Sequence, residues 1–393
     1  MDLREQKGRV IAQTRTIKKM DDGYAVQSQN SERFYFVDKQ GVCTCPDCQK
    51  GSTDKCKHAF AVQYYLQKIT TQRDGSVKVE NKRLTYPQAW SAYNKSQTSE
   101  KEQFLKLLKD LTNTEQEANF GRPKANIGEM AFCCALKVYT QFSTRRANTD
   151  IKEAFEKGLI SKTHHYNTII KYFNEPELTP LLESLIAESS APLKSVETSF
   201  AVDSTGFRTT KFNDYCKEKH DTKKAHQWVK LHAVCGTKTN TITSCQVSEN
   251  NSGDSLYFAP LIQQTADNGF SLQEVSADKA YSSRANYDTV KELGGKAYIP
   301  FRSNASGNSK GSQTWKKMFH YFQFNKEEFG QFYHKRSNIE TSFYSLKAKF
   351  NDCLKSRKPI AQKNELLLKV LCYNIVCLIH EVNELGISLD FRS

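Results

Sequence analysis

The sequence YHKRSNIETSFYSLKAKF, residues Tyr333–Phe350, carries the pattern around which the rest of the chain can be ordered. Four polar residues in it fall within one face of a helix at about 100° per residue: Tyr333, Arg336, Glu340 and Lys347. Arg336 and Glu340 form an i,i+4 pair of opposite charge. An adjoining apolar stripe consists of Ile339, Phe343 and Leu346. The pattern predicts a helix that packs against a core, and a solvated salt-bridge helix is the ordinary alternative.

Two aspartates upstream stand at the ends of apolar strand signals. Asp203 ends SFAV and is followed by Ser204 and Thr205, and Asp278 ends QEVSA and is followed by Lys279-Ala280-Tyr281. An aspartate at the end of a buried strand lies at the rim of a sheet, where loops build functional sites. Taken singly, each aspartate is better explained as a turn or helix-capping residue.

The strand signals begin at Ser199 and predict an α/β fold. They read SFAVDST, HQWVKLHAVCG, TITSCQVS, QEVSADKAY and KAYIPF. Helical signals follow the last two strands, in SSRANYDTVKELG and in Tyr333–Phe350, and Leu366–Leu385 is a closing helix. Consecutive antiparallel strands followed by strand–helix alternation predict a mixed sheet with helices on its faces.

Helical patterns dominate the segment before this sheet. Residues 98–119 are amphipathic, IGEMAFCCALKVYTQF is apolar enough to be buried, and NTDIKEAF begins with Asn148 or Thr149 as an N-cap. Short helices with tight turns resemble a helix-turn-helix bundle, and its last helix offers Lys162, Thr163, His165, Asn167 and Lys171. A plain helical linker domain fits the pattern equally well.

Four potential metal ligands crowd near the amino terminus. Residues 24–45 alternate like a hairpin, and CKHAFAVQYYLQKI (Cys56–Ile69) has helical periodicity. The ligands are three thiols and one imidazole, a complete tetrahedral zinc set: Cys43, Cys45, Cys56 and His58. Residues two apart on a helix point about 200° away from each other, so Cys56 and His58 converge only where the chain enters the helix. Chance clustering of buried cysteines is the alternative, and Cys48 is a spare thiol that can replace one ligand.

This CxC…CxH pattern, with a hairpin before it and a helix after it, resembles the SWIM zinc-finger family over about residues 22–70. That family is associated with DNA or protein binding. A closed site of four protein ligands is structural, so the Zn²⁺ is expected to hold the fold and to do no chemistry.

Composition narrows the class of protein. The chain has 393 residues, a formal net charge of +14 and a pI near 9.1, which fits a nucleic-acid partner and a merely solubilising basic surface about equally well. The apolar run Leu366–His380 is interrupted by Lys369 and Asn374, which argues against a membrane span, and no signal-peptide core follows Met1. Twelve cysteines, clustered or in apolar runs, do not suggest a secreted disulfide scaffold. We therefore expect a soluble, cytoplasmic protein.

Together, the carboxylates and the helix resemble the DDE transposases of bacterial and archaeal insertion sequences. Tyr333, Arg336, Glu340 and Lys347 match the Tyr-x(2)-Arg-x(3)-Glu-x(6)-Lys signature of one subgroup without a gap. The boxes that begin at Asp203 and Asp278 match that family in order and context. The resemblance covers about residues 120–385.

The resemblance implies a ribonuclease-H-like core in which Asp203, Asp278 and Glu340 hold two Mg²⁺ (or Mn²⁺) ions. It also implies DNA contacts by Tyr333, Arg336 and Lys347. The implied activity is transposition: binding the terminal inverted repeats of a mobile element, cutting them, and transferring the 3′-hydroxyl ends into target DNA. A homodimer in the synaptic complex and association with the nucleoid follow as expectations, without a membrane partner.

The predicted organisation has three parts. Residues 1–97 hold the basic region with the zinc finger, residues 98–195 the helical DNA-binding domain, and residues 196–393 the catalytic domain with an insertion at about 300–332. Within this insertion Trp315 is either a core residue or a site for a flipped base. Two alternative functions stay open: a domesticated DNA-binding protein with an inactive core, and a metal-dependent nuclease without strand transfer. A role of residues 1–97 in binding another protein is also open.

Overall fold

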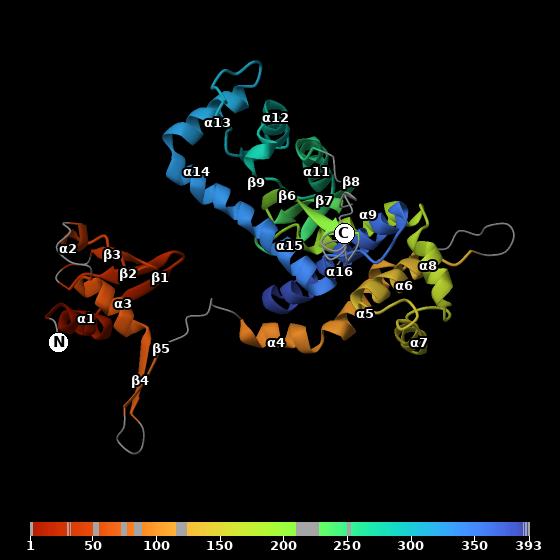
Figure 1. Ribbon diagram of the computed structural model, residues 1–393, viewed down its shortest axis with the longest axis horizontal. Coiled ribbons are helices and arrows are strands. Elements are labelled where there is room, and N and C mark those ends of the chain that lie inside the picture. The colour runs from red at the N-terminus through yellow and green to blue at the C-terminus, as the bar shows by residue number, and fades with distance from the viewer. Residues whose placement is uncertain are drawn as a thin grey trace, which may run out of the picture. The chain divides into compact units, whose positions relative to one another are not determined.

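The chain is described from a computed structural model that places residues 3–29, 31, 33–49, 55–71, 77–81, 89–114, 124–209, 228–249, 253–387, 389 and 391. It forms two compact units, Met1–Gln88 and Ala89–Ser393 (Figure 1). Among the described residues, no helix is both long enough and apolar enough to cross a membrane. The predicted division of the second unit into a helical and a catalytic domain stays a prediction.

The first unit is a three-stranded antiparallel sheet with helices. Its strands in sheet order are β1 (Ile17–Met20), β2 (Gly23–Gln27) and β3 (Phe34–Asp38). The helices are α1 (Leu3–Thr14), α2 (Pro46–Gln49) and α3 (Lys57–Tyr65). Sequence reasoning missed α1, which packs closely on α3: a Cβ atom on Gly8 would lie 2.5 Å from the Cβ of Phe60.

The helix predicted over Cys56–Ile69 is shorter than expected. Helix α3 ends at Tyr65, and β4 (Gln67–Thr71) pairs antiparallel with β5 (Val77–Asn81). The sequence of β4, QKITT, is rich in β-branched residues, which fit a strand better than a helix. The helical periodicity therefore ran past the true end of the helix.

The second unit is built on a mixed five-stranded sheet, as an α/β fold predicts. Its strands are β6 (Ser199–Arg208), β7 (Trp228–Gly236), β8 (Ile242–Glu249), β9 (Glu274–Ala277) and β10 (Lys296–Tyr298). Their order is β10-β9-β6-β7-β8, with β6, β7 and β8 antiparallel and β9 parallel to both β6 and β10. This arrangement is consistent with a ribonuclease-H-like domain. Residues 226–227 of the predicted second strand lie outside the described residues.

Alternate residues of β6 belong to two different cores. Phe200 and Val202 pack with α11 (Ser255–Asp267) and α12 (Arg284–Glu292), whereas Ala201 and Phe207 pack with α15 (Ser337–Phe350). Because side chains alternate along a strand, Asp203 and Thr205 share the face of Ala201 and Phe207. Strand β6 thus presents Asp203 and Thr205 toward α15, which lies below the sheet in Figure 1.

The remaining helices of this core surround α16 (Pro359–Leu385), which is buried along most of its length. They are α4 (Trp90–Thr98), α5 (Glu100–Leu111), α6 (Ile127–Tyr139), α7 (Asn148–Glu156), α8 (Tyr166–Phe173) and α9 (Leu178–Ser190). The predicted helix over residues 98–119 corresponds to α5, and residues 115–119 lie outside the described residues. Helix α7 is capped by Ala147, one residue before the predicted cap.

The predicted insertion is helical and the signature helix is interrupted. Helices α13 (Gln313–Phe324) and α14 (Lys326–Tyr333) follow the Gly/Ser-rich loop, and a 3₁₀ turn, η3 (His334–Arg336), separates α14 from α15. Tyr333 and Glu340 therefore lie on different helices. Trp315 is a core residue: it is 5% exposed, and its Nε1 donates a 2.8 Å hydrogen bond to the carbonyl oxygen of Ser306.

Candidate functional site

Asp203 and Asp278 are brought together by the pairing of β6 with β9. The two strands are parallel, and Val202 lies opposite Ala277, so the next residues along the two chains are the two aspartates. Asp278 also caps the 3₁₀ turn η2 (Lys279–Tyr281), where its carboxylate accepts a 2.6 Å hydrogen bond from the backbone N–H of Lys279. The register thus places Asp203, in the middle of β6, beside Asp278, which directly follows β9.

Arg336 links the first aspartate to the glutamate. Its guanidinium lies 2.8 Å from Asp203 and also donates to Glu340 in the first turn of α15. Because η3 places Arg336 directly before α15, one side chain reaches both carboxylates. The structure therefore places Asp203, Asp278 and Glu340 in one region, where β9 ends and α15 begins.

The three carboxylates of this site repel one another electrostatically. Burial raises the pKa of Asp203 above its ordinary value, and the charges of Asp278 and Glu340 raise it further. The backbone N–H of Ser204 and the guanidinium of Arg336 oppose this shift without cancelling it. A cation placed among these carboxylates would relieve their mutual repulsion.

Lys347 and Tyr333 border the site differently. Lys347 donates a 2.6 Å hydrogen bond to Oγ1 of Thr205, two residues after Asp203, and its ammonium lies 5.2 Å from the centre of the Phe207 ring. Burial lowers the pKa of Lys347. Tyr333 is half-buried at the end of α14, where it packs against the core on the opposite face of the sheet from α15. Lys347 is therefore fixed beside the carboxylates.

Arg302 is a site residue that sequence reasoning missed. It donates to the carbonyl oxygens of Lys279 and Ala280, at 3.4 and 3.0 Å, and so clamps the turn that presents Asp278. No motif marks it, because it sits in a Gly/Ser-rich loop that reads as a connection. The only sequence signal is a lone arginine directly after the strand signal KAYIPF.

A second group that sequence reasoning missed surrounds His232 on β7, the strand next to β6. His232 is opposite Ser204 on β7, is 1% exposed, and lies 3.6 Å from the carboxylate of Asp254. Its Nε2 is 2.8 Å from the Ser248 hydroxyl, and its ring stacks on Tyr257. Burial lowers the pKa of His232 to about 4, so the imidazole is neutral near pH 7.

The carboxylate site fits divalent cations of the magnesium type. Its donors are hard carboxylate oxygens, which Mg²⁺ and Mn²⁺ prefer. The guanidinium of Arg336 lies between Asp203 and Glu340 and supplies there the positive charge that a metal ion would supply. Asp203 and Glu340 both contact this arginine. Among the described residues, one set of three or more His, Cys, Asp or Glu residues brings its ligand atoms within 4.8 Å of one another, and it is a Cys/His group rather than the three carboxylates.

That group is the predicted zinc set, Cys43, Cys45, Cys56 and His58, and all four residues are buried. Cys56 is the N-cap of α3 and His58 lies in its first turn, as the two-residue spacing predicts. Cys43 pairs with Val37 across the end of the hairpin. Nε2 of His58 is buried without a hydrogen-bond partner, which a metal ion would satisfy.

The thiols of Cys43 and Cys56 are hydrogen-bonded to each other. The hydrogen bond from Cys43, together with one from His58, lowers the pKa of Cys56 to about 3. Cys48 is half-buried and its thiol pKa is raised to about 11, chiefly by burial. The chemistry of three thiols and an imidazole is compatible with Zn²⁺.

Comparison with known proteins finds similarity over the part of the chain that contains the carboxylate site. Residues 194–375 match the protein family described as a transposase DDE domain, which supports a DDE transposase, an enzyme class that cleaves DNA with divalent metal ions. A cryo-EM structure of the piggyBac transposase synaptic complex with hairpin DNA is similar at 12% sequence identity and a TM-score of 0.34, covering 74% of each chain.

Proposed function

We propose that this chain, whose residues 194–375 match a transposase DDE domain, binds the ends of a mobile DNA element, cuts them and joins their 3′-hydroxyl ends to target DNA. The observation that carries the proposal is the register of β6 and β9, which sets Asp203 beside Asp278 while Arg336 connects Asp203 to Glu340. Because two ends are joined in one event, we expect a homodimer on DNA.

Asp203, Asp278 and Glu340 would together hold two divalent ions. When bound, such ions would supply activation of the attacking water or 3′-hydroxyl and stabilisation of the leaving oxygen. The aspartates rest on a buried strand pair and the glutamate on a helix packed into the core, so the protein supplies a rigid frame for these ligands.

The basic residues would position the DNA backbone. The planar fork of Arg336 suits two phosphate oxygens, and Lys347, held by Thr205, supplies a point charge next to Asp203. Tyr333 would hydrogen-bond a phosphate or stack on a base. Arg302 would keep Asp278 in place through its two backbone contacts.

We further propose that Cys43, Cys45, Cys56 and His58 hold one structural Zn²⁺ in a SWIM-type finger. The buried, unpartnered imidazole nitrogen and the mutual closeness of the four ligands support it. Deleting residues 1–88 and measuring affinity for the element's ends would distinguish a DNA-binding role of this unit from a protein-binding one.

The proposal is tested with a plasmid that carries the gene and its flanking DNA. Asp203→Asn, Asp278→Asn and Glu340→Gln should each abolish Mg²⁺-dependent cutting at the element's ends while leaving DNA binding close to wild type. Asp267→Asn, at the carboxyl end of α11, is the matched control and should cut normally.

Three outcomes would overturn parts of this assignment. Cutting by any of the three carboxylate variants would remove that residue from the catalytic set. Normal cutting by the wild type with no joined product would leave a nuclease, and no cutting at all would leave a DNA-binding protein with an inactive core.

A further inference from the structure

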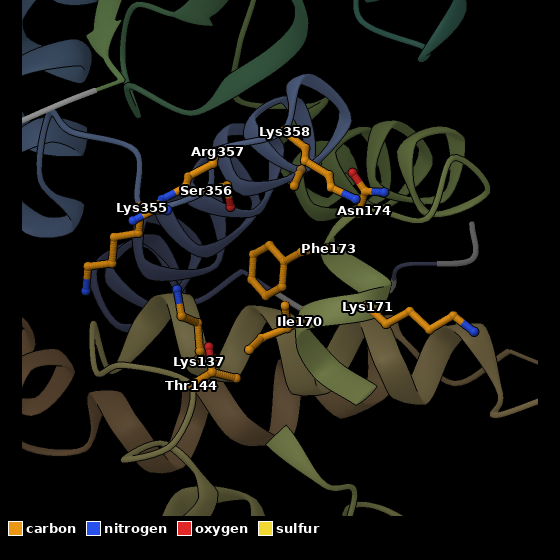
Figure 2. Close-up of a pocket in the computed structure, with 11 residues that line it drawn as sticks. Lys137, Thr144, Ile170, Lys171, Phe173, Asn174, Lys355, Ser356, Arg357 and Lys358 are labelled. Carbon is orange, nitrogen blue, oxygen red and sulfur yellow. The ribbon is translucent and has the colours of Figure 1, made fainter. Parts of the chain in front are cut away.

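A basic groove lies on the face of the second unit that carries α6 and α8. It has a volume of about 480 Å³ and is lined by Lys137 of α6, by Ile170 and Phe173 of α8, and by the segment Lys355–Lys358 before α16. No acidic side chain lines the groove among the described residues. Figure 2 shows Lys137 to one side of the Phe173 ring, with its ammonium directed toward this segment.

Lys137 is a mostly buried lysine whose ammonium opens on the groove without a counter-charge. Its residue is 6% exposed, its ammonium lies 5.1 Å from the centre of the Phe173 ring, and in the described part of the chain it has no ion pair or side-chain hydrogen bond. A long side chain with a buried stem keeps its charged end at the water-filled surface, where it attracts negative charge. An anion in the groove would complete the environment of Lys137.

The segment Lys355–Lys358 adds cations and a helix amino terminus. Its backbone is fixed by Glu365, whose carboxylate accepts hydrogen bonds from the N–H groups of Lys355 and Ser356 at 2.7–3.0 Å. Arg357 and Lys358 are exposed, and α16 begins at Pro359 without a side-chain cap. The uncapped N–H groups of the first turn and the two side chains favour negative charge at the same place.

The chain just before the groove-lining segment Lys355–Lys358 is hydrogen-bonded to β6, the strand that carries Asp203. The backbone of Arg208, at the end of β6, bonds to Asp352 and Leu354 at 2.8 and 2.7 Å, so the segment before α16 extends the edge that carries Asp203. The Phe207 ring lies between the ammonium groups of Lys347 and Lys369, at 5.2 and 5.5 Å. Arg208 lies five residue steps along the strand from Asp203, or about 17 Å, which is about five base steps of B-DNA.

We propose that this groove binds the sugar–phosphate backbone of DNA that leads away from the catalytic carboxylates. Lys137 and the Arg357–Lys358 pair take phosphates, and Ile170 and Phe173 pack against deoxyribose. A run of cations over an apolar floor, continuous with Lys347, suits an extended strand better than a small free anion. The inference rests on the proposed function, because it takes DNA as the substrate of the neighbouring site.

The test measures binding of a duplex of about three helical turns at several salt concentrations, without divalent ions other than the protein's own metal. The variants are Lys137→Met, which keeps the apolar stem on Phe173, and the double change Arg357→Gln with Lys358→Gln. Each lost phosphate contact should lower the slope of log affinity against log salt by about 0.9 and weaken binding about three- to five-fold. Lys291→Gln, on α12, removes an exposed charge elsewhere and should change neither.

Thermal unfolding separates a binding role from a structural one. Lys137→Met should unfold at the wild-type temperature or above it, because the change keeps the buried stem and removes only a charge without a counter-charge. Wild-type affinity and slope in both groove variants would overturn the inference. If the groove variants bind weakly while Asp203→Asn still cuts DNA, the groove stands and the proposed catalytic function fails.

Discussion

At the scale of single residues, Arg336 decides the state of the carboxylate site. It compensates Asp203 and Glu340 at once, and their negative charges, with burial opposing them, raise its pKa. A lysine could not reproduce this fork, because its ammonium is a point charge. Arg336 therefore holds the carboxylates together when they have no other cation.

Replacing Arg336 with glutamine should lower the melting temperature of the metal-free protein, because two carboxylates lose their counter-ion. Added Mn²⁺ should then raise the melting temperature more than it does in the wild type. Differential scanning calorimetry with and without Mn²⁺ measures both effects. An identical response to Mn²⁺ in the two proteins would show that Arg336 and the metal do not share the site.

His232 predicts an acid sensitivity whose sign follows from linkage. Its pKa is about 4 in the folded chain against 6.5 unfolded, so below pH 6.5 the unfolded state binds more protons and stability falls as the pH falls. Between pH 7 and pH 5 the loss is about 2 kcal/mol. In His232→Gln the loss over the same interval should be smaller by that amount, measured by urea unfolding. Equal losses would contradict a buried neutral imidazole.

At the scale of elements, the sequence predicts whether a segment is a helix or a strand better than it predicts where that element begins and ends. Alternating and apolar runs located β6 to β10, and the two aspartates that follow apolar runs led to the site. Asp278 directly follows β9 as expected, whereas Asp203 lies in the middle of β6 and not at its end. Periodicity could not show that η3 interrupts the signature helix, since a 3₁₀ turn shifts phase without a marker residue such as proline. Helices α1, α4, α11, α13 and α14 were not predicted, and contacts such as Gly8 on Phe60 have no local signature.

The polar residues that interrupt the apolar run of α16 prove to be structural. Asn374 is fully buried and bonds through its side chain to both the N–H and the carbonyl of Ile242, at 3.0 and 2.7 Å. Strand β8 lies at the edge of the sheet, so this side chain covers an edge that has no neighbouring strand. Lys369 similarly donates to the carbonyls of Asn351 and Cys353.

Asn374→Leu should therefore destabilise the second unit by about 2–4 kcal/mol, because two buried backbone groups of β8 lose their partner. Urea unfolding measures the change. Asn383→Leu, on the same helix but only part-buried, is the control and should cost less than about 1 kcal/mol. A similar loss in free energy of unfolding for the two variants would show that Asn374 does not stabilise the edge of the sheet.

At the scale of the whole molecule, the chain consists of two units that should respond separately to metal removal. The core of the first unit is small and includes three of the zinc ligands, Cys43, Cys45 and Cys56, so its fold should depend on the ion. The second unit has its own extensive cores and contains none of these ligands.

Purified protein should contain about one zinc per chain, and a chelator or Cys56→Ser should remove it. The first unit should then become sensitive to protease while Ala89–Ser393 stays resistant. Elemental analysis and limited proteolysis measure this. A metal-free wild type whose first unit resists protease would end the zinc proposal, and a loss of the second unit would show that the two depend on each other.

The central claim is that Asp203, Asp278 and Glu340 hold divalent ions together, and iron-directed cleavage of the polypeptide tests it most directly. Fe²⁺ in place of Mg²⁺, with ascorbate and peroxide, cuts the chain beside the bound ion. We predict cuts near residues 203, 278 and 340 that excess Mg²⁺ suppresses and Asp203→Asn abolishes. Cuts that avoid these three positions, or that persist unchanged in Asp203→Asn, would contradict the shared metal site.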